Sequence, residues 1–426
     1  MKTPPAVRER LASIISPRRD EMIADLARFV AIPTGHNHTP GLETFRAILT
    51  ARLEALGAKA EVIPGDPRPE WLTESTDRDR AKAFEPPPTV VCRRPIKERP
   101  RILLAGHLDT VFDPHGPFQS FTLSPDGRTA TGPGVVDMKG GILIALVALE
   151  ALEKMCIPVS WSFLLNSDEE TGSYASDRAL RAEAARNDLG LALEPALPDG
   201  GLVTERKGSG QFLIEAFGTS AHAGRDFEKG VSAVYALAQA ITRCERLCDV
   251  SRGLTVNIGP LKGGEATNIV PDYAAAWGNV RFPDSTGADE LVRGLESIAR
   301  SFSEAASGMD RAAGSSAPAT PSQEASRHPR IRIRHSIARP AKPVTPRTRQ
   351  LAETIRSVSE ALGAPLPFGT SGGVCDGNNL QEAGLPTLDT LGVKGGGLHT
   401  QHEWINIESL VERATMLACV LAELSA

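Results

Sequence analysis

Short apolar runs alternate with amphipathic segments in the first half of the chain. The runs at 101–106, 159–165 and 189–193 predict buried strands, because they are continuous, apolar and only a few residues long. Between the first two lies an amphipathic segment, 140–154, which predicts a helix with an apolar stripe along one face. The stripe consists of Ile142, Leu146, Leu149 and Leu152. Strands that alternate with helices in this way indicate an α/β domain with a mostly parallel sheet.

The same α/β pattern extends to both ends of the chain. Its remaining elements are expected, in chain order, as helices at 17–31 and near 42–56, a helix at 346–362, a strand at 386–390 and a helix at 407–424. The first helix has Ser16 or Pro17 as its cap and ends before Pro33. The segment 65–100 interrupts the pattern, since it is rich in Pro, Arg and Asp and shows little periodicity. It therefore predicts an irregular surface insertion.

The order of the elements changes after residue 207. The elements expected there are a strand at 211–218, a helix at 230–246, strands at 254–259 and 272–281, a helix at 287–306 and a strand at 330–337. This β-α-β-β-α-β order is typical of a ferredoxin-like α+β domain. A low-complexity tract at 308–329 is expected to be flexible. Because the α/β pattern then returns, we expect one domain formed by 1–206 and 341–426, with a second domain, 207–340, inserted into it.

Composition and charge narrow the classes of protein that fit this architecture. The 426 residues are 41% hydrophobic and 23% charged, which is the balance of a soluble globular protein. A net charge of −5 gives no basic field for nucleic acid, and no apolar run is long enough to span a bilayer. The amino-terminal segment lacks the apolar core of a signal peptide, and the six cysteines are sparse and scattered. These features favour a cytoplasmic protein without nucleic-acid or membrane partners.

Acidic and imidazole side chains follow the predicted strands of the α/β domain. They are His107 and Asp109 after the strand at 101–106, Asp168, Glu169 and Glu170 after 159–165, Glu194 after 189–193, and His399 beyond 386–390. Asp137 lies in a Gly-rich loop ahead of the helix at 140–154. In open parallel sheets ligands bind beyond the carboxyl ends of the strands, so we expect these side chains to converge.

The converging residue types predict a metal centre. Imidazole and carboxylate ligands suit zinc, or cobalt or manganese in its place. The carboxylates together carry more negative charge than one divalent ion would balance. We therefore expect two divalent ions about 3.5–4 Å apart with a shared carboxylate. Glu169 and Glu170 point to opposite sides if their segment is extended, so that one binds metal while the other contacts water. The alternative, a solvated acidic loop, is disfavoured because the other candidate ligands accompany it.

Six short motifs, in this order along the chain, resemble those of the M20 metallopeptidases. They are GHLDTVF, GPGVVDMKGG, NSDEETGS, LEPA, TSAHAG and GLHTQHEW. The family includes glutamate carboxypeptidases, acetylornithine deacetylases, succinyl-diaminopimelate desuccinylases and aminoacylases. The resemblance covers nearly the whole chain. It implies a zinc-hydrolase catalytic domain with an inserted dimerisation or lid domain, and hence a homodimer formed through the inserted domain. The sequence departs from the family at 65–100, at 308–329 and at Cys375-Asp376.

The resemblance also implies which residues bind the two metal ions. Asp137 bridges the ions, His107 and Glu194 complete one site, and Glu170 and His399 complete the other. With these five positions the chain has every ligand that the resemblance requires.

The catalytic roles implied by the resemblance fall on residues beside the ligands and in the inserted domain. Glu169 is the general base, and Asp109 holds the second ring nitrogen of His107. The Asp137–Met138 peptide bond is expected to be cis. His222 is expected to donate to the developing oxyanion, either after domain closure or from a partner subunit. The alternative for His222 is a turn histidine packed within its own domain.

Substrate recognition requires a positive charge, because an acidic metal centre cannot by itself hold the free carboxylate of a leaving amino acid. By the resemblance, Arg281 occupies the place of a substrate-facing arginine and Arg339 is a weaker match. Asn268 is expected to contact the substrate near the same face. The alternative for Arg281 is a solvated arginine at a strand end.

The function that these features predict is hydrolysis of an amide bond in a peptide or N-acyl amino acid by metal-activated water, as in glutamate carboxypeptidases. Three alternatives remain open. They are a deacylase of the acetylornithine deacetylase type, an aminopeptidase that requires a free α-amine, and a metal-dependent binding protein without catalysis. The presence of Glu169 argues against the last of these.

Overall fold

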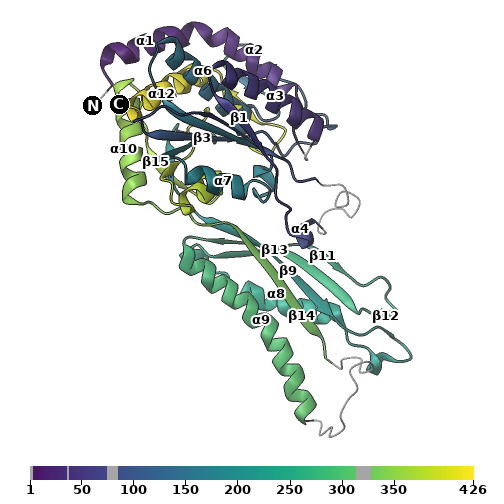
Figure 1. Ribbon diagram of the computed structural model, residues 1–426. Coiled ribbons are helices and arrows are strands. Elements are labelled where there is room, and N and C mark those ends of the chain that lie inside the picture. Colours follow the sequence, from purple (N-terminus) through teal and green to yellow (C-terminus); the bar gives the residue numbers. More distant parts are fainter. Residues whose placement is uncertain (1–2, 36–37, 74–84, 313–327) are drawn as a thin grey trace. The chain divides into compact units, whose positions relative to one another are not determined.

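The structure, a computed structural model, describes residues 3–35, 38–73, 85–312 and 328–426. The chain forms two compact units (Figure 1). Unit 1 consists of Met1–Arg68, Glu85–Arg206 and Lys342–Ala426, and unit 2 consists of Pro69–Phe84 and Lys207–Ala341. Within the described ranges, no helix is long and apolar enough to cross a membrane.

Unit 1 is built on a six-stranded sheet that is mostly parallel, as predicted. Its strands, in spatial order, are β1 (Lys59–Ile63), β2 (Thr89–Arg94), β6 (Ser160–Asn166), β3 (Arg101–His107), β7 (Leu189–Ala192) and β16 (Thr387–Leu388). The last four run parallel to one another, whereas β2 is antiparallel to β6 and β1 is antiparallel to β2. His107 stands opposite Asn166 in the β3–β6 register, so these two strands end level with each other.

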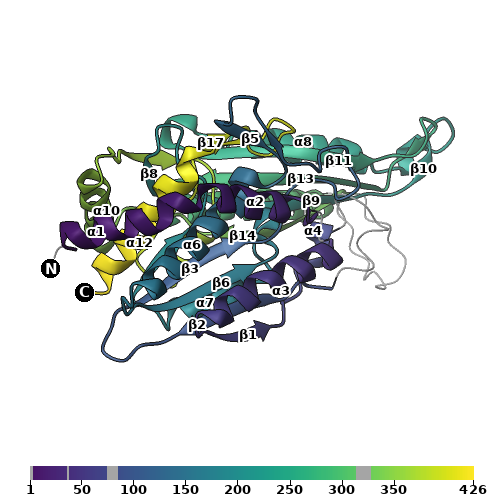
Figure 2. The ribbon, with the colours of Figure 1, turned by 90° about the horizontal axis from the view of Figure 1, so that it is seen from above.

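Helices cover both faces of this sheet, because successive residues of a strand point to opposite sides. The helices of unit 1 are α1 (Pro5–Ile15), α2 (Arg19–Val30), α3 (Thr39–Ala55), α6 (Gly140–Lys154), α7 (Asp177–Ala184), α10 (Pro346–Ala361), α11 (Asp376–Glu382) and α12 (Glu408–Leu424). Leu104 of β3 packs in a core with α1, α2, α3, α6, α10 and α12, whereas Leu103 packs in a smaller core with α7 and α11. Figure 2 looks onto the layer that contains α1, α2, α6 and α12.

Shorter elements complete unit 1. They are β4 (Thr122–Leu123), β5 (Thr129–Thr131), β17 (Gly395–Gly396) and β18 (Trp404–Asn406), in the sheet order β17-β18-β5-β4, the parallel pair β8 (Leu202–Arg206) and β15 (Phe368–Ser371), and the helical turns η1 (Ser16–Arg18), η2 (Val135–Lys139) and η3 (Glu169–Thr171). Candidate metal ligands lie on η2, on η3 and in the loop between β17 and β18.

Unit 2 has the ferredoxin-like order that the sequence predicts. Its elements are β9 (Gly208–Phe217), α8 (Ala233–Glu245), β11 (Thr255–Gly263), β13 (Tyr273–Phe282), α9 (Ser285–Ala312) and β14 (Arg330–Arg339), together with β10 (Ala221–His222), β12 (Ile269–Val270), η4 (Phe227–Lys229), η5 (Val250–Arg252) and α4 (Glu70–Thr73). The antiparallel sheet has the order β11-β13-β9-β14. Helices α8 and α9 pack on one face, where Phe212 and Ile214 of β9 meet Leu237 and Leu295.

Part of the segment 65–100 is regular structure, contrary to the prediction. Strand β2 is an interior strand of the unit 1 sheet, and its short run TVVCRR is hidden in the sequence between Pro-rich and Arg-rich stretches. Helix α4 belongs to unit 2, where the Trp277 Nε1–H donates to the carbonyl oxygen of Trp71 at 3.1 Å. Residues 74–84 lie outside the described residues.

Other boundaries also differ from the sequence-based expectation. The prediction has neither α1 nor β1, because both are short and carry many exposed polar residues. The helix expected at 17–31 begins at Arg19, after the turn η1. Within the tract 308–329, helix α9 continues to Ala312, and 313–327 lie outside the described residues.

Candidate metal centre

His107 stands at the carboxyl end of β3 and is fixed through both ring nitrogens. Its side chain is 1% exposed. Nδ1 donates to the backbone carbonyl oxygen of Asp109 at 3.0 Å, and the Asp109 carboxylate lies 3.5 Å from the same nitrogen. Nε2 lies 3.1 Å from Oδ1 of Asp137. The imidazole therefore presents Nε2 towards Asp137, and Asp109 sets its orientation chiefly through the backbone.

Asp137 lies between two histidines. It belongs to η2, directly before α6, and the Asp137–Met138 peptide bond is cis, as predicted. Its Oδ1 faces His107, and its Oδ2 lies 3.4 Å from Nε2 of His399. The same His399 nitrogen is 3.2 Å from Oε2 of Glu170. Each oxygen of one carboxylate thus faces a different imidazole.

The Asp109 carboxylate anchors the turn that carries Glu169 and Glu170. Oδ1 accepts the backbone N–H of Glu169 at 3.2 Å, and Oδ2 accepts that of Glu170 at 3.0 Å. This turn is η3, a 3-10 helix, so the prediction of an extended segment was wrong. Neighbouring side chains on a 3-10 helix are about 120° apart around the axis, so the two glutamates still diverge. The sequence did not reveal that Asp109 supports this turn.

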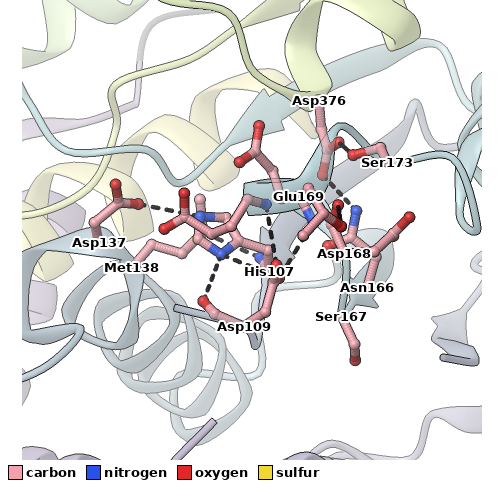
Figure 3. A network of polar contacts seen from close by, with 12 residues as sticks. His107, Asp109, Asp137, Met138, Asn166, Ser167, Asp168, Glu169, Ser173 and Asp376 are labelled. Carbon is pink, nitrogen blue, oxygen red and sulfur yellow. Dashed lines mark hydrogen bonds and ion pairs between the residues drawn. The ribbon is translucent and has the colours of Figure 1, made fainter. Parts of the chain in front are cut away.

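The first acid of the triplet, Asp168, belongs to a buried network beside the turn (Figure 3). Its Oδ2 accepts the backbone N–H of Ala175 at 2.6 Å. Asp376 accepts from Ser173 Oγ at 2.6 Å and from Asn166 Nδ2 at 2.7 Å. Burial raises the pKa of Asp168 to about 7. Asp168 and Asp376 therefore hold the loop in place, and only Glu169 and Glu170 of the triplet remain as candidates for the metal chemistry.

Glu194 follows β7 and is buried. Burial, with the nearby carboxylates of Asp137 and Glu169, raises the pKa of Glu194 well above its usual value. Among the described residues, His107, Asp137 and Glu170 offer ligand atoms that all lie within 4.8 Å of one another, a group that does not include Glu194. Glu194 is thus outside this three-residue group, although the Asp137 carboxylate contributes to the raised pKa of Glu194.

The electrostatics of the cluster favour bound cations. Hydrogen bonds to Asp137 and Glu170 raise the pKa of His399 to about 10. Burial alone would lower the pKa of His107, but Asp109 and Asp137 raise it well above its usual value. Burial also raises the pKa of Glu170. Two imidazoles among more carboxylates than they can balance are a donor set that fits divalent zinc, cobalt or manganese.

In unit 2, His222 and Asn268 lie side by side. His222 is exposed on β10, where its Nδ1 accepts the backbone N–H of Gly224 at 3.1 Å. Its register partner on β12 is Ile269, and Asn268 accepts the Ala223 N–H on its carbonyl oxygen at 2.9 Å. The side chain of His222 is thus not packed inside its own unit.

Arg281 and Arg339 form a second pair, at the other end of the unit 2 sheet. Both are register partners of Ser209 on β9, so they flank that strand on one face. Burial lowers the pKa of Arg281, and its Nη1 is buried without a hydrogen-bond partner among the described residues. Asn268 lies directly before β12, which precedes Tyr273 at the start of β13. Arg281 lies eight residues after Tyr273 along β13, which is a length of strand of about 27 Å. The structure thus separates Asn268 from Arg281, which the sequence placed near one face.

Known proteins share this sequence pattern and this fold. Residues 103–423 match the family described as Peptidase family M20/M25/M40. Carboxypeptidase G2 of Pseudomonas sp. (strain RS-16) is 25% identical over 410 residues, which cover 95% of this chain and 89% of that protein. A tripeptidase structure from Staphylococcus aureus has a TM-score of 0.72 at 22% identity, covering 95% of this chain and 98% of that one. The YxeP structure from Bacillus subtilis, described as a dinuclear metal binding peptidase from the M20 family, has a TM-score of 0.61 at 14% identity, covering 96% and 98%.

Proposed function

This chain belongs to peptidase family M20/M25/M40, whose members are metal-dependent, and we propose that it hydrolyses an amide bond of a peptide or N-acyl amino acid with two bound divalent ions. The observation that carries the two-ion proposal is the position of Asp137, whose carboxylate oxygens face two different histidines. A carboxylate placed in this way can bridge two cations. The description of the Bacillus subtilis neighbour as dinuclear supports the same count.

We propose that five residues would hold the two ions. His107 and Glu194 would bind one ion, Glu170 and His399 would bind the other, and Asp137, which faces both histidines, would be shared. Zinc is our first choice, and cobalt and manganese accept the same ligand types. When bound, such ions polarise a substrate carbonyl and lower the pKa of water. The raised pKa values of Glu170 and Glu194 support this assignment, because two divalent ions would balance these buried carboxylates.

We propose that Glu169 is the general base of the reaction. It accepts a proton from the attacking water and delivers that proton to the leaving nitrogen, which balances the hydrolysis. Its backbone N–H is held by Asp109, and on the 3-10 turn its side chain diverges from that of Glu170. Proton transfer by a positioned carboxylate typically contributes about 10²–10⁴-fold to the rate.

We propose that His222 and Asn268 act on the substrate of a partner subunit in a homodimer formed through unit 2. His222 then donates to the developing oxyanion. The separation from Arg281 supports this, because no single amino-acid or dipeptide substrate spans about 27 Å of strand.

All six cysteines are free, which suits the reducing cytoplasm that we propose as the location of the protein.

We propose that Arg281 binds the free carboxylate of the leaving amino acid, with Arg339 beside it. The buried Nη1 of Arg281 supports this role, since a buried donor without a partner costs about 1–3 kcal/mol unless a ligand accepts from it. A guanidinium can grip a carboxylate with two parallel hydrogen bonds. This preference for a carboxylate-bearing product is what relates the proposal to glutamate carboxypeptidases.

The variant Arg281→Ala should raise KM about tenfold to hundredfold for carboxylate-bearing substrates and much less for their amide analogues. The reason is that a hydrogen bond to a charged group contributes about 1.5–3 kcal/mol. Steady-state kinetics on matched acid and amide substrates measure the effect. Arg300→Ala, which removes an exposed arginine of the same unit, is the control and should change neither KM. An equal loss on acid and amide substrates would mean that Arg281 supports the fold of unit 2 instead.

Zinc-loaded protein should contain close to two ions per chain. We expect two ions because Asp137 lies between two histidines, each of which would bind a separate cation under this proposal. Elemental analysis after removal of loosely bound metal measures the ratio. A value that never exceeds one ion per chain would contradict the two-ion centre.

A hydrolysis panel distinguishes the proposed function from its alternatives. The panel contains dipeptides and N-acyl amino acids, each with a free or an acylated α-amine. Cleavage of acylated substrates that carry a free carboxylate supports the carboxypeptidase proposal, and a preference for short acyl groups would indicate a deacylase. A strict requirement for a free amine would indicate an aminopeptidase. Metal binding without any hydrolysis would indicate a binding protein.

A further inference from the structure

Glu403 is a fully buried carboxylate with no assigned role in the site. It lies directly before β18 and is 0% exposed. A buried carboxylate is costly unless its lone pairs are satisfied, so the partners of Glu403 indicate what it does. Those partners are three backbone donors of the loop that enters α6.

The carboxylate of Glu403 accepts three backbone N–H groups from the Asp137 loop. Oε2 accepts from Gly134 at 3.1 Å, and Oε1 accepts from Val136 at 2.8 Å and from Asp137 at 3.1 Å. Backbone N–H groups that point at one anion form a concave nest, which fixes the conformation of the segment that supplies them. Because the backbone N–H of Asp137 is one of the three donors, the nest fixes the backbone position from which the Asp137 side chain extends.

The same residue also fixes the loop that carries His399. Glu403 is four residues after His399, and its backbone N–H donates to the carbonyl oxygen of Thr400 at 3.1 Å. The next residue, Trp404, begins β18, which pairs with β17 on one side and with β5 on the other. Strand β5 leads into the Asp137 loop, so Glu403 joins two loops that both contribute to the candidate metal centre.

We propose that Glu403 is a positioning residue that holds Asp137 and His399 in place for metal binding and thereby sets the affinity of the centre for its divalent ions. This inference rests on the proposed two-ion function. Its geometric basis is that Oδ2 of Asp137 faces Nε2 of His399 at 3.4 Å, a contact between the two loops that Glu403 joins. Partners of this kind behind metal ligands change metal affinity about 10–100-fold when they are removed.

The test compares Glu403→Gln with Glu408→Gln, a matched change at an exposed glutamate that pairs with Arg19 at 2.8 Å. Glutamine keeps one acceptor oxygen and places an amide NH₂ where the second oxygen accepts, so at least one N–H of the nest loses its partner. Cobalt(II) binding is followed by the visible absorption of the bound ion, in competition with a chelating dye. We expect Glu403→Gln to bind cobalt about 10–100-fold more weakly, and Glu408→Gln to bind it like the parent protein.

Amide hydrogen exchange of the metal-free protein tests the nest without any reference to metal. Exchange across 134–137 should be faster in Glu403→Gln than in the parent protein and unchanged in Glu408→Gln. Glu403→Asp, which keeps the charge but is one methylene shorter, should fall between the two and serves if the glutamine variant does not fold. Unchanged exchange together with unchanged cobalt affinity would overturn the inference. A parent protein that binds no cobalt would instead contradict the proposed function, while the exchange data would still report on the nest.

Discussion

Replacing Glu169 by glutamine is expected to lower kcat for the best amide substrate by about 10²–10⁴-fold while fold and metal content stay unchanged. Glutamine has nearly the same shape but cannot accept the proton of the attacking water. The anchoring hydrogen bond from the backbone N–H of Glu169 to Asp109 is retained, because the substitution changes only the side chain. Activity on the hydrolysis panel measures kcat, and elemental analysis of the same preparation measures the metal content.

Glu170→Gln is the matched control for this experiment. Its side chain contacts His399 at 3.2 Å, so it should lose part of the metal content and lose activity in proportion. The two variants lie on adjacent residues of one 3-10 turn and should nevertheless differ in kind. If both variants lost metal equally and kept activity in proportion to the metal that remained, the assignment of Glu169 as the base would be wrong.

The largest expected effect on stability comes from Asp389→Ala, which should lower the free energy of unfolding by about 3–5 kcal/mol. Oδ1 of Asp389 lies 2.8 Å from Arg206 Nη2, and Oδ2 lies 3.2 Å from Lys342 Nζ. The side chains of Asp389 and Lys342 are 0% exposed and that of Arg206 is 8% exposed. Removal of the carboxylate leaves two buried cations without their shared partner.

Asp389, Arg206 and Lys342 come from distant parts of the chain. The loss of stability in Asp389→Ala should therefore extend beyond one side chain. Arg206 and Lys342 are the unit 1 residues at two of the points where the chain passes between the units, namely the start and the end of 207–341. Their backbones bond reciprocally, at 3.0 Å from Arg206 N to Lys342 O and at 2.9 Å in the other direction. Asp389, which directly follows β16, therefore pairs with both Arg206 and Lys342. The backbones of those two residues are already aligned by their reciprocal hydrogen bonds.

Chemical denaturation measures the loss, with Asp188→Ala as the control. Asp188 also pairs with an arginine, Arg101, at 2.8 Å, but both side chains are about half exposed, and exposed pairs contribute about 0–1 kcal/mol. Burial opposes ionisation of Asp389, yet the cations Arg206 and Lys342 hold its pKa below the usual value. The stabilisation that ionised Asp389 contributes is therefore present above about pH 4 and is lost as the pH falls further. Equal losses in the two variants at neutral pH would contradict this account.

Parts of the structure were hidden from the sequence for identifiable reasons. Strand β2 is short and lies among Pro-rich and Arg-rich residues, so its periodicity is too brief to stand out. Glu403 lies in the polar stretch GLHTQHEW, and the N–H group of Gly134 that it accepts is 269 residues away in the sequence. No local pattern records a partner at that distance. The same holds for Asp376, whose partner Asn166 is 210 residues away.

The sequence by itself determined the classes of the two units and the chemistry of the candidate centre. Continuous apolar runs between amphipathic segments dictate a parallel sheet covered by helices, and side chains that follow such strands must meet at one edge. Only the tertiary structure decided the geometry. Strand register set His107 level with Asn166, and long-range hydrogen bonds set the turn of Glu169 and the orientation of Asp137 between its two histidines. Periodicity reports which face of an element is buried, whereas register and buried polar pairing depend on residues far apart in the chain.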